Sequence, residues 1–180
     1  VPAYNWSGFY LGGNIGYGWG DLNATANGLG ESFSIDGWFA GGQIGYNWQF
    51  NPNWLIGIEG DIGYLNTKRE FDDFDNFNGT GHFGVKSTWY STFRGRLGYV
   101  TGPSLLYVTG GGAAVRLEER YGSPAVQTVL KTTDTGWTVG GGIETKLTRN
   151  WTAKTEYLYI DTGSNSFTGP ALGFTNPPGA

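Results

Sequence analysis

The sequence contains no cysteine and no methionine, and His82 is its single histidine. Without cysteine, disulfide bonds and thiolate metal sites are excluded. No apolar run approaches the ~18 residues of a membrane-spanning helix, which excludes a helical membrane protein. The net charge is −4 and like charges do not form blocks, so nothing favours nucleic-acid binding. Because the chain starts at Val1 rather than at methionine, we expect that a signal peptide has been removed.

Motifs for catalysis are also absent. The patterns HExxH and GxSxG do not occur, and His82 lies in a polar stretch without Cys or His partners. The glycine runs 110–112 and 140–142 lie within alternating segments, and no GK[ST] sequence follows them as a phosphate-binding loop would require. We therefore predict a protein that is not an enzyme, with no catalytic residues, no cofactor and no metal site.

Glycine and aromatic residues are abundant, at 33 of 180 residues and 17% respectively. Residues 38–50 and 54–64 flank a turn at 51–53 and alternate apolar with polar side chains, which predicts a hairpin of two strands. Aromatic residues mark the ends of the apolar face, and aliphatic or small residues fill its middle. A bilayer selects this order, because amphipathic rings settle at the headgroups. The hairpin therefore predicts a transmembrane β-barrel with its apolar face outward.

The same alternation predicts five further strands, at about 7–20, 88–100, 105–118, 133–147 and 151–161. The apolar faces carry a girdle that we predict to face lipid: Trp19, Trp38, Tyr46, Trp48, Trp54, Tyr64, Trp89, Tyr99, Trp137, Trp151, Tyr157 and Tyr159. The connections alternate between short (51–53, 101–104, 148–150) and long (21–34, 66–86, 119–131, from 162). This asymmetry is typical of an outer-membrane barrel.

Seven strands are readable, whereas a closed bacterial barrel needs an even number, so we expect eight. Residues 162–180 contain Pro170, Pro177 and Pro178 and alternate poorly, so we interpret them as a loop or a truncated tail. We therefore expect the closing strand to be missing from this sequence. The alternative is a complete chain whose open seventh edge pairs with something else, such as another protomer. The whole chain, 1–180, is predicted to be one barrel domain preceded by a short N-terminal segment, 1–6.

The inward faces of neighbouring predicted strands carry four acids and four bases. Side chains fill a barrel of about eight strands, and charges buried there must pair or reach water. We predict an interior ion-pair network of Glu59, Asp61, Arg94, Arg96, Glu144, Lys146, Lys154 and Glu156. The favoured interpretation is a structural plug. The alternatives are a network that gates a narrow path for ions or water, and paired carboxylates for acid–base catalysis.

Three segments carry a family resemblance: YNWSGFYLGGNIGYGWG at 4–20, GGQIGYNWQ at 41–49 and WTAKTEYLYIDTG at 151–163. They resemble the small outer-membrane β-barrel family of alphaproteobacteria, whose members are named outer membrane immunogenic protein or porin-family protein. That family is distantly related to the outer-membrane protein A and X barrels. The resemblance implies eight strands, a cleaved signal peptide and surface display, and it supplies no catalytic residues. Family chains usually end in a strand with a terminal aromatic residue, which this sequence lacks.

We thus predict a non-enzymatic, surface-displayed structural barrel in the outer membrane of a Gram-negative bacterium, with a charge-plugged interior and long extracellular loops. The alternative is a narrow pore for ions or small solutes. A lipocalin-like soluble barrel conflicts with the outward girdle, and a lipid-modifying enzyme needs a cluster that His82 alone does not supply. Outer-membrane lipid and lipopolysaccharide are the expected partners, with a second copy of the chain or other envelope proteins as further candidates, and no nucleic acid.

Overall fold

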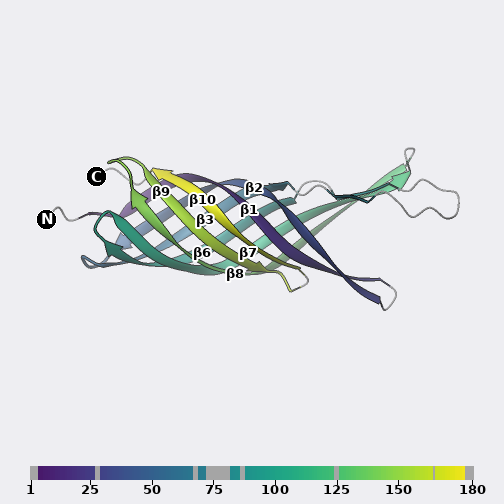
Figure 1. The fold of residues 1–180 in the computed structure, drawn as a ribbon, viewed down its shortest axis with the longest axis horizontal. Coiled ribbons are helices and arrows are strands. Elements are labelled where there is room, and N and C mark those ends of the chain that lie inside the picture. The colour runs from purple at the N-terminus through teal and green to yellow at the C-terminus, as the bar shows by residue number, and fades with distance from the viewer. Residues whose placement is uncertain are drawn as a thin grey trace.

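Long antiparallel strands close into a barrel in the computed structural model, which describes residues 4–26, 29–66, 69–71, 82–85, 88–123, 126–163 and 165–176. The eight barrel strands in this part of the chain are β1 (Gly8–Ala26), β2 (Leu29–Gln49), β3 (Trp54–Asn66), β6 (Thr88–Thr101), β7 (Ser104–Ser123), β8 (Val126–Lys146), β9 (Thr152–Asp161) and β10 (Asn165–Asn176). Each pairs with the next, and β1 pairs with β10. Figure 1 shows the strands tilted around one axis, with both termini at the same end. The predicted fold class is confirmed.

Connections at the end of the barrel that holds the termini are short, as predicted. Between β6 and β7 the turn has only Gly102 and Pro103, because Thr101 already pairs with Ser104. Gly102 has a φ of 60°, which glycine adopts without strain in a hairpin turn. Among the described residues, no helix is long and apolar enough to span a membrane.

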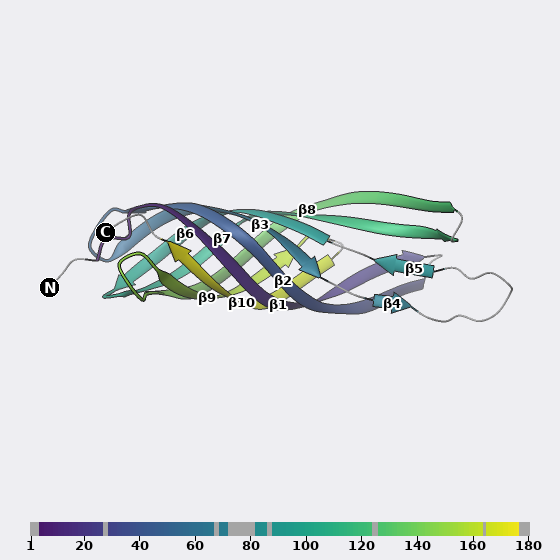
Figure 2. The ribbon, with the colours of Figure 1, turned by 90° about the horizontal axis from the view of Figure 1, so that it is seen from above.

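At the opposite end, two stretches that the sequence predicted as loops are strands. Residues 21–26 and 29–34 continue the ladder of β1 with β2, and residues 119–123 and 126–131 continue that of β7 with β8. A further short hairpin, β4 (Arg69–Phe71) with β5 (His82–Val85), pairs with the extension of β7. Backbone hydrogen bonds hold these extensions together whatever the side-chain pattern, which is why alternation did not reveal them. Figure 2 shows them projecting beyond the barrel. Residues 67–68, 72–81 and 86 of the predicted loop 66–86 lie outside the described residues.

The prediction that the closing strand is missing was wrong. Residues 165–176 form β10, which pairs with β9 on one side and β1 on the other. Its inward positions include Gly169, Ala171 and Gly173, and its outward positions include Leu172 and Phe174. Because these three inward residues are small rather than polar, the middle of the strand does not show the polar–apolar alternation by which the others were recognised.

Pro170 is compatible with β10 because of where its missing N–H falls. The ladder between β1 and β10 is interrupted between the pairs Gly16–Ala171 and Trp19–Thr168, which brackets Pro170. The carbonyl oxygen of Pro170 faces Gly16 on β1, so in a strand its nitrogen points to the same side. On the other side Pro170 remains in register with Tyr157 of β9. The proline therefore removes a donor only where the ladder is already broken.

The barrel exposes its large apolar side chains on the outer wall and buries its charged ones inside, the reverse of a soluble protein. Ile44, Ile58 and Val139 are 55%, 54% and 46% exposed on the outer wall, whereas Arg94 and Glu144 are 1% and 3% exposed inside. The alternation of each strand produces this inversion, because successive side chains point to opposite faces.

Aromatic side chains gather in two belts on the outer wall, near its two ends. Cross-strand partners form them, for example Trp54 with Tyr99 (ring centroids 5.2 Å apart) and Tyr64 with Trp89 (5.6 Å). Trp54 and Tyr64 mark the two ends of the apolar face of β3. At ~3.3 Å per residue and a tilt of ~40°, the step of ten residues from one to the other spans about 25 Å, the height of the apolar band of outer-membrane barrels. Of the twelve predicted girdle residues, Tyr159 is half-buried and the other eleven are exposed on this wall.

Inside, large rings lie over glycines of the neighbouring strand. A Cβ at Gly45 would come within 2.2 Å of the Tyr10 ring, and one at Gly16 within 2.3 Å of the Phe39 ring. These glycines therefore provide space for inward aromatic residues in a narrow lumen.

Candidate functional site

Buried charged side chains fill the middle of the lumen. Three bases and four acids project inward from β3, β6, β8 and β9: Arg94, Arg96, Lys154, Glu59, Asp61, Glu144 and Glu156. Each is at most 7% exposed. Three of the strands supply two charges each at positions i and i+2, which the pleat places on the same face. These seven residues are called the lumen network below.

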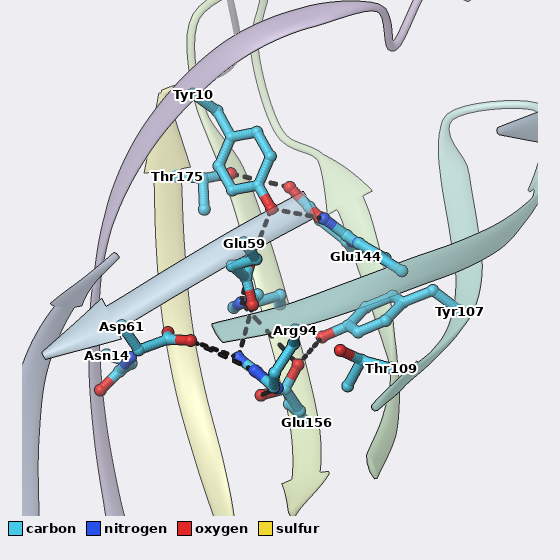
Figure 3. Close-up of polar contacts among 12 residues, drawn as sticks. Tyr10, Asn14, Glu59, Asp61, Arg94, Tyr107, Thr109, Glu144, Glu156 and Thr175 are labelled. Carbon is cyan, nitrogen blue, oxygen red and sulfur yellow. Dashed lines mark hydrogen bonds and ion pairs between the residues drawn. The ribbon is translucent and has the colours of Figure 1, made fainter. Parts of the chain in front are cut away.

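Arg94 is the centre of the lumen network. Its guanidinium donates to Asp61 at 2.8 Å and to Glu59 at 2.5 Å on β3, and to Glu156 at 2.8 Å on β9. Figure 3 shows Arg94 between these three carboxylates. A planar guanidinium suits this role, because its fork of donors can serve several carboxylates at once.

Some of these contacts cross the whole barrel. Lys154 on β9 donates to Glu59 on β3 at 3.2 Å, and these strands lie four apart in the ring of eight, on opposite walls. The ion pair of Arg94 with Glu156 likewise joins β6 to β9, three strands away. The network is therefore a set of crossbars through the lumen rather than a lining along its wall.

A second cluster lies beside the first and is centred on Glu144. One carboxylate oxygen pairs with Arg96, and the other accepts hydrogen bonds from Thr152 at 2.6 Å and Thr175 at 2.7 Å. The guanidinium of Arg96 also stacks on the Tyr107 ring, 3.9 Å from its centroid. Every oxygen of Glu144 is thus engaged, which offsets the desolvation of a buried carboxylate.

Hydroxyl side chains complete the lumen network, and the sequence-based prediction did not include them. Tyr10 donates to Glu59 at 2.6 Å, Tyr107 to Glu156 at 2.8 Å and Thr92 to Asp61 at 2.8 Å. Their inward positions in the alternation were the available signal, because a polar side chain that faces a narrow lumen lies within reach of the charges there.

The lumen network is not neutral and not fully satisfied. Three cations face four carboxylates, which gives a formal charge of −1 (3 − 4). The Asp61 Oδ1 atom and both amide atoms of Gln43, its register partner on β2, are buried without a hydrogen-bond partner. Each carboxylate nevertheless contacts an arginine. Within the part of the chain that the structure describes, no group of three His, Cys, Asp or Glu residues is arranged to hold a metal ion.

Lys146, the eighth residue of the predicted network, lies apart from it. Its Nζ donates to the carbonyl oxygen of Asn5 at 2.7 Å and sits 5.0 Å from the centre of the Trp6 ring. Trp6 is 2% exposed and packs in a cluster with Leu55, Val100, Leu105 and Tyr107 at the end with the short turns. Instead of reaching the network, Lys146 helps to hold Trp6 in place, where Trp6 obstructs that end of the barrel. His82 lies in β5, and its side chain is outside the described residues.

Comparisons with known proteins agree with this architecture. Residues 2–176 match the family described as outer membrane protein beta-barrel domain. The chain is 32% identical over 170 residues to the 25 kDa outer-membrane immunogenic protein of Brucella abortus, covering 93% of this chain and 70% of that protein. It is 34% identical over 173 residues to the 22 kDa outer membrane protein of Rhizobium leguminosarum, covering 92% and 69%. Neisserial surface protein A has the same fold, with a TM-score of 0.62, 16% identity and coverage of 95% and 97%.

Proposed function

Since the chain belongs to the outer membrane protein β-barrel domain family, we propose that it is a non-enzymatic structural barrel that displays hairpins at the cell surface. As an outer-membrane protein it sits in lipid with its apolar wall. We propose further that the aromatic belts contact the headgroups and that the lumen network closes the interior. The crossbars from β9 and β6 to the opposite wall carry the proposal of closure.

The crossbars argue for a plug because an ion in transit must separate them. The side chains of Arg94 and Glu59 are 1% and 2% exposed and already in contact. Removing one partner from such a buried pair costs about 3–5 kcal/mol, because the other charge is left uncompensated. A passing ion that disrupts several such pairs meets a correspondingly high barrier. Trp6 adds a second obstruction toward the end with the termini.

Surface display rests on the strand extensions. The β1–β2 and β7–β8 hairpins and the β4–β5 hairpin project at the end opposite the termini (Figures 1 and 2). Outer-membrane barrels have short periplasmic turns and longer extracellular connections, so we assign this end to the cell exterior. In that orientation lipopolysaccharide is the expected lipid partner of the nearer aromatic belt, and the hairpins offer contacts to envelope or external partners.

A narrow pore is the second candidate, and one observation favours it. Gln43, Asn47 and Asp61 carry buried polar atoms without a partner, all on the wall formed by β2 and β3. Buried polar atoms of this kind usually bind water. A file of water along that wall would offer a path beside the crossbars.

Conductance measured together with stability separates the two functions. For a plug, the refolded native barrel in a planar bilayer conducts at background level. Glu156→Gln then lowers the free energy of unfolding by about 1–3 kcal/mol, because it weakens a buried charged hydrogen bond, and conductance stays low. For a pore, conductance of the native barrel lies far above background and changes with Glu156→Gln. Lys146→Gln is the matched control outside the network and should change neither quantity much.

A further inference from the structure

Beyond the lumen network, the half of the interior farther from the termini is apolar. It contains a partly open apolar pocket of about 70 Å³, called the distal chamber below. Its walls are almost entirely carbon, supplied by Phe39, Leu65, Tyr90, Val115, Ile160 and Phe167 among others. These side chains point inward at positions where the alternation predicts polar residues in a water-filled barrel.

The distal chamber lies beyond the charged residues, toward the extended hairpins. On β3, β6 and β9 the chamber residues lie farther from the short turns than the charged residues of the same strands. The rings of Tyr90 and Phe39 meet edge to face, with centroids 6.0 Å apart, and the Tyr90 hydroxyl donates to Asn14. This layer separates the chamber from the charges, so a molecule in the chamber meets rings and aliphatic side chains rather than ions.

We propose that the distal chamber binds a small uncharged apolar molecule, such as a benzene-sized ring or a short hydrocarbon chain. Water is a poor occupant, because a buried water needs two to four polar partners and an apolar cavity of this kind stays dry. A charged molecule would have no counter-charge in these walls. An apolar guest, in contrast, replaces empty space by van der Waals contacts with these walls. This inference goes beyond the proposed function and does not depend on whether the barrel conducts.

The surroundings of the distal chamber determine how a guest molecule enters it. The wall of the barrel is closed, because where the β1–β10 ladder is interrupted the backbones stay in contact, and a Cβ at Gly169 would lie 2.7 Å from the Cα of Gly18. The lumen network with Trp6 fills the interior on the side of the termini. The guest therefore enters from the end with the extended hairpins, which under the proposed orientation faces the exterior. An acyl chain of a membrane lipid has the same apolar chemistry but a different source, and the experiment below distinguishes the two.

Gly18 provides a way to fill the chamber. It lines the cavity, and a Cβ there would meet Thr168 O at 3.4 Å and the Phe39 ring at 3.8 Å, so a side chain is accommodated. Gly13 on the same strand is the matched control: it points outward, and its Cβ would have a nearest neighbour at 3.7 Å. Gly18→Leu therefore places an isobutyl group in the chamber, and Gly13→Leu places the same group on the outer wall.

The test is methyl NMR of the full chain, labelled at Ile, Leu and Val methyls, in lipid nanodiscs titrated with benzene. We expect saturable shifts at Val115, Leu158 and Ile160, and only linear, partition-driven shifts at the outward Val108 and Val139. Gly13→Leu should keep the saturable response, and Gly18→Leu should weaken it by about tenfold or more. If Gly18→Leu does not fold, Val115→Phe fills the chamber from the opposite wall.

Three results would overturn the proposal: linear shifts at all methyls, an unchanged titration in the folded filling variant, or nuclear Overhauser effects from lipid acyl protons to Val115 and Ile160. The last result would identify a lipid chain as the resident occupant. None of them affects the conductance of the barrel, so failure here is distinguishable from failure of the proposed plug.

Discussion

The two halves of the lumen are filled in opposite ways. Toward the termini, the interior is filled by seven charged side chains that are each at most 7% exposed and bonded across the barrel. Toward the extended hairpins, the same strands present rings and aliphatic side chains, and a cavity of about 70 Å³ remains. Long flexible charged side chains reach one another and close the space, whereas short rigid apolar ones leave a void. The inward face of a membrane barrel strand is therefore not uniformly polar.

The largest expected effect comes from making the charged half resemble the apolar half. Arg94→Met keeps an unbranched apolar stem but leaves Glu59, Asp61 and Glu156 without their shared cation. We expect the free energy of unfolding to fall by about 3–5 kcal/mol. Urea unfolding in lipid vesicles, followed by tryptophan fluorescence, measures it. Arg94→Lys restores the charge without the fork and should recover only part of the loss. Full stability of Arg94→Met would show that the network is not a structural plug.

The converse exchange should have a smaller effect. Val115→Asn puts an amide among apolar walls, where we expect a loss of about 1–3 kcal/mol because the group has no partner. Val115→Leu, of similar size but apolar, is the control in the same unfolding experiment. Equal stability of the two variants would mean that water reaches the distal chamber, and the contrast between the halves would then disappear.

The smallest effect is expected at the boundary of the charged half. Lys146 is partly exposed and bonds a backbone carbonyl beside Trp6 rather than a carboxylate. Lys146→Gln should therefore lower stability by less than about 1 kcal/mol. A loss as large as that of Arg94→Met, measured side by side, would place Lys146 within the network after all.

Which residues of the barrel strands face outward and which face inward could largely be predicted from the sequence, because side chains of a strand alternate between only two faces. The outward Ile44 and Ile58 and the inward Glu59 and Arg94 follow from alternation once the hairpin at 38–64 is recognised. In an up-and-down barrel, strands that follow one another along the chain lie side by side, so the contact between β3 and β6 was foreseeable although a long connection joins them. The partners across the lumen were not, because Glu156 lies 62 residues from Arg94 and on a strand that does not adjoin it.

Two features were not predicted from the sequence, for a different reason. In β10 the inward residues Gly169, Ala171 and Gly173 are too small to be recognised as polar or apolar, and Pro170 is tolerated only because the ladder to β1 is interrupted there. The distal chamber was missed because Phe39 and Leu65 occupy a face that was interpreted as polar. Their inward position was visible, but the cavity depends on how side chains from opposite walls fit, which periodicity does not contain.

The bond from Lys154 to Glu59 has a consequence for how the protein assembles. It joins residues 95 apart in sequence on opposite walls, so it forms only after the sheet has curled and its first and last strands have met. Until then, at least four carboxylates and three cations face an open groove and remain hydrated. Zippering of β1 against β10 must expel that water, and contacts of such long sequence separation form slowly. The ion pairs across the lumen therefore form late in assembly. A chain stalled before this step would still expose the carboxylates of the lumen network to solvent.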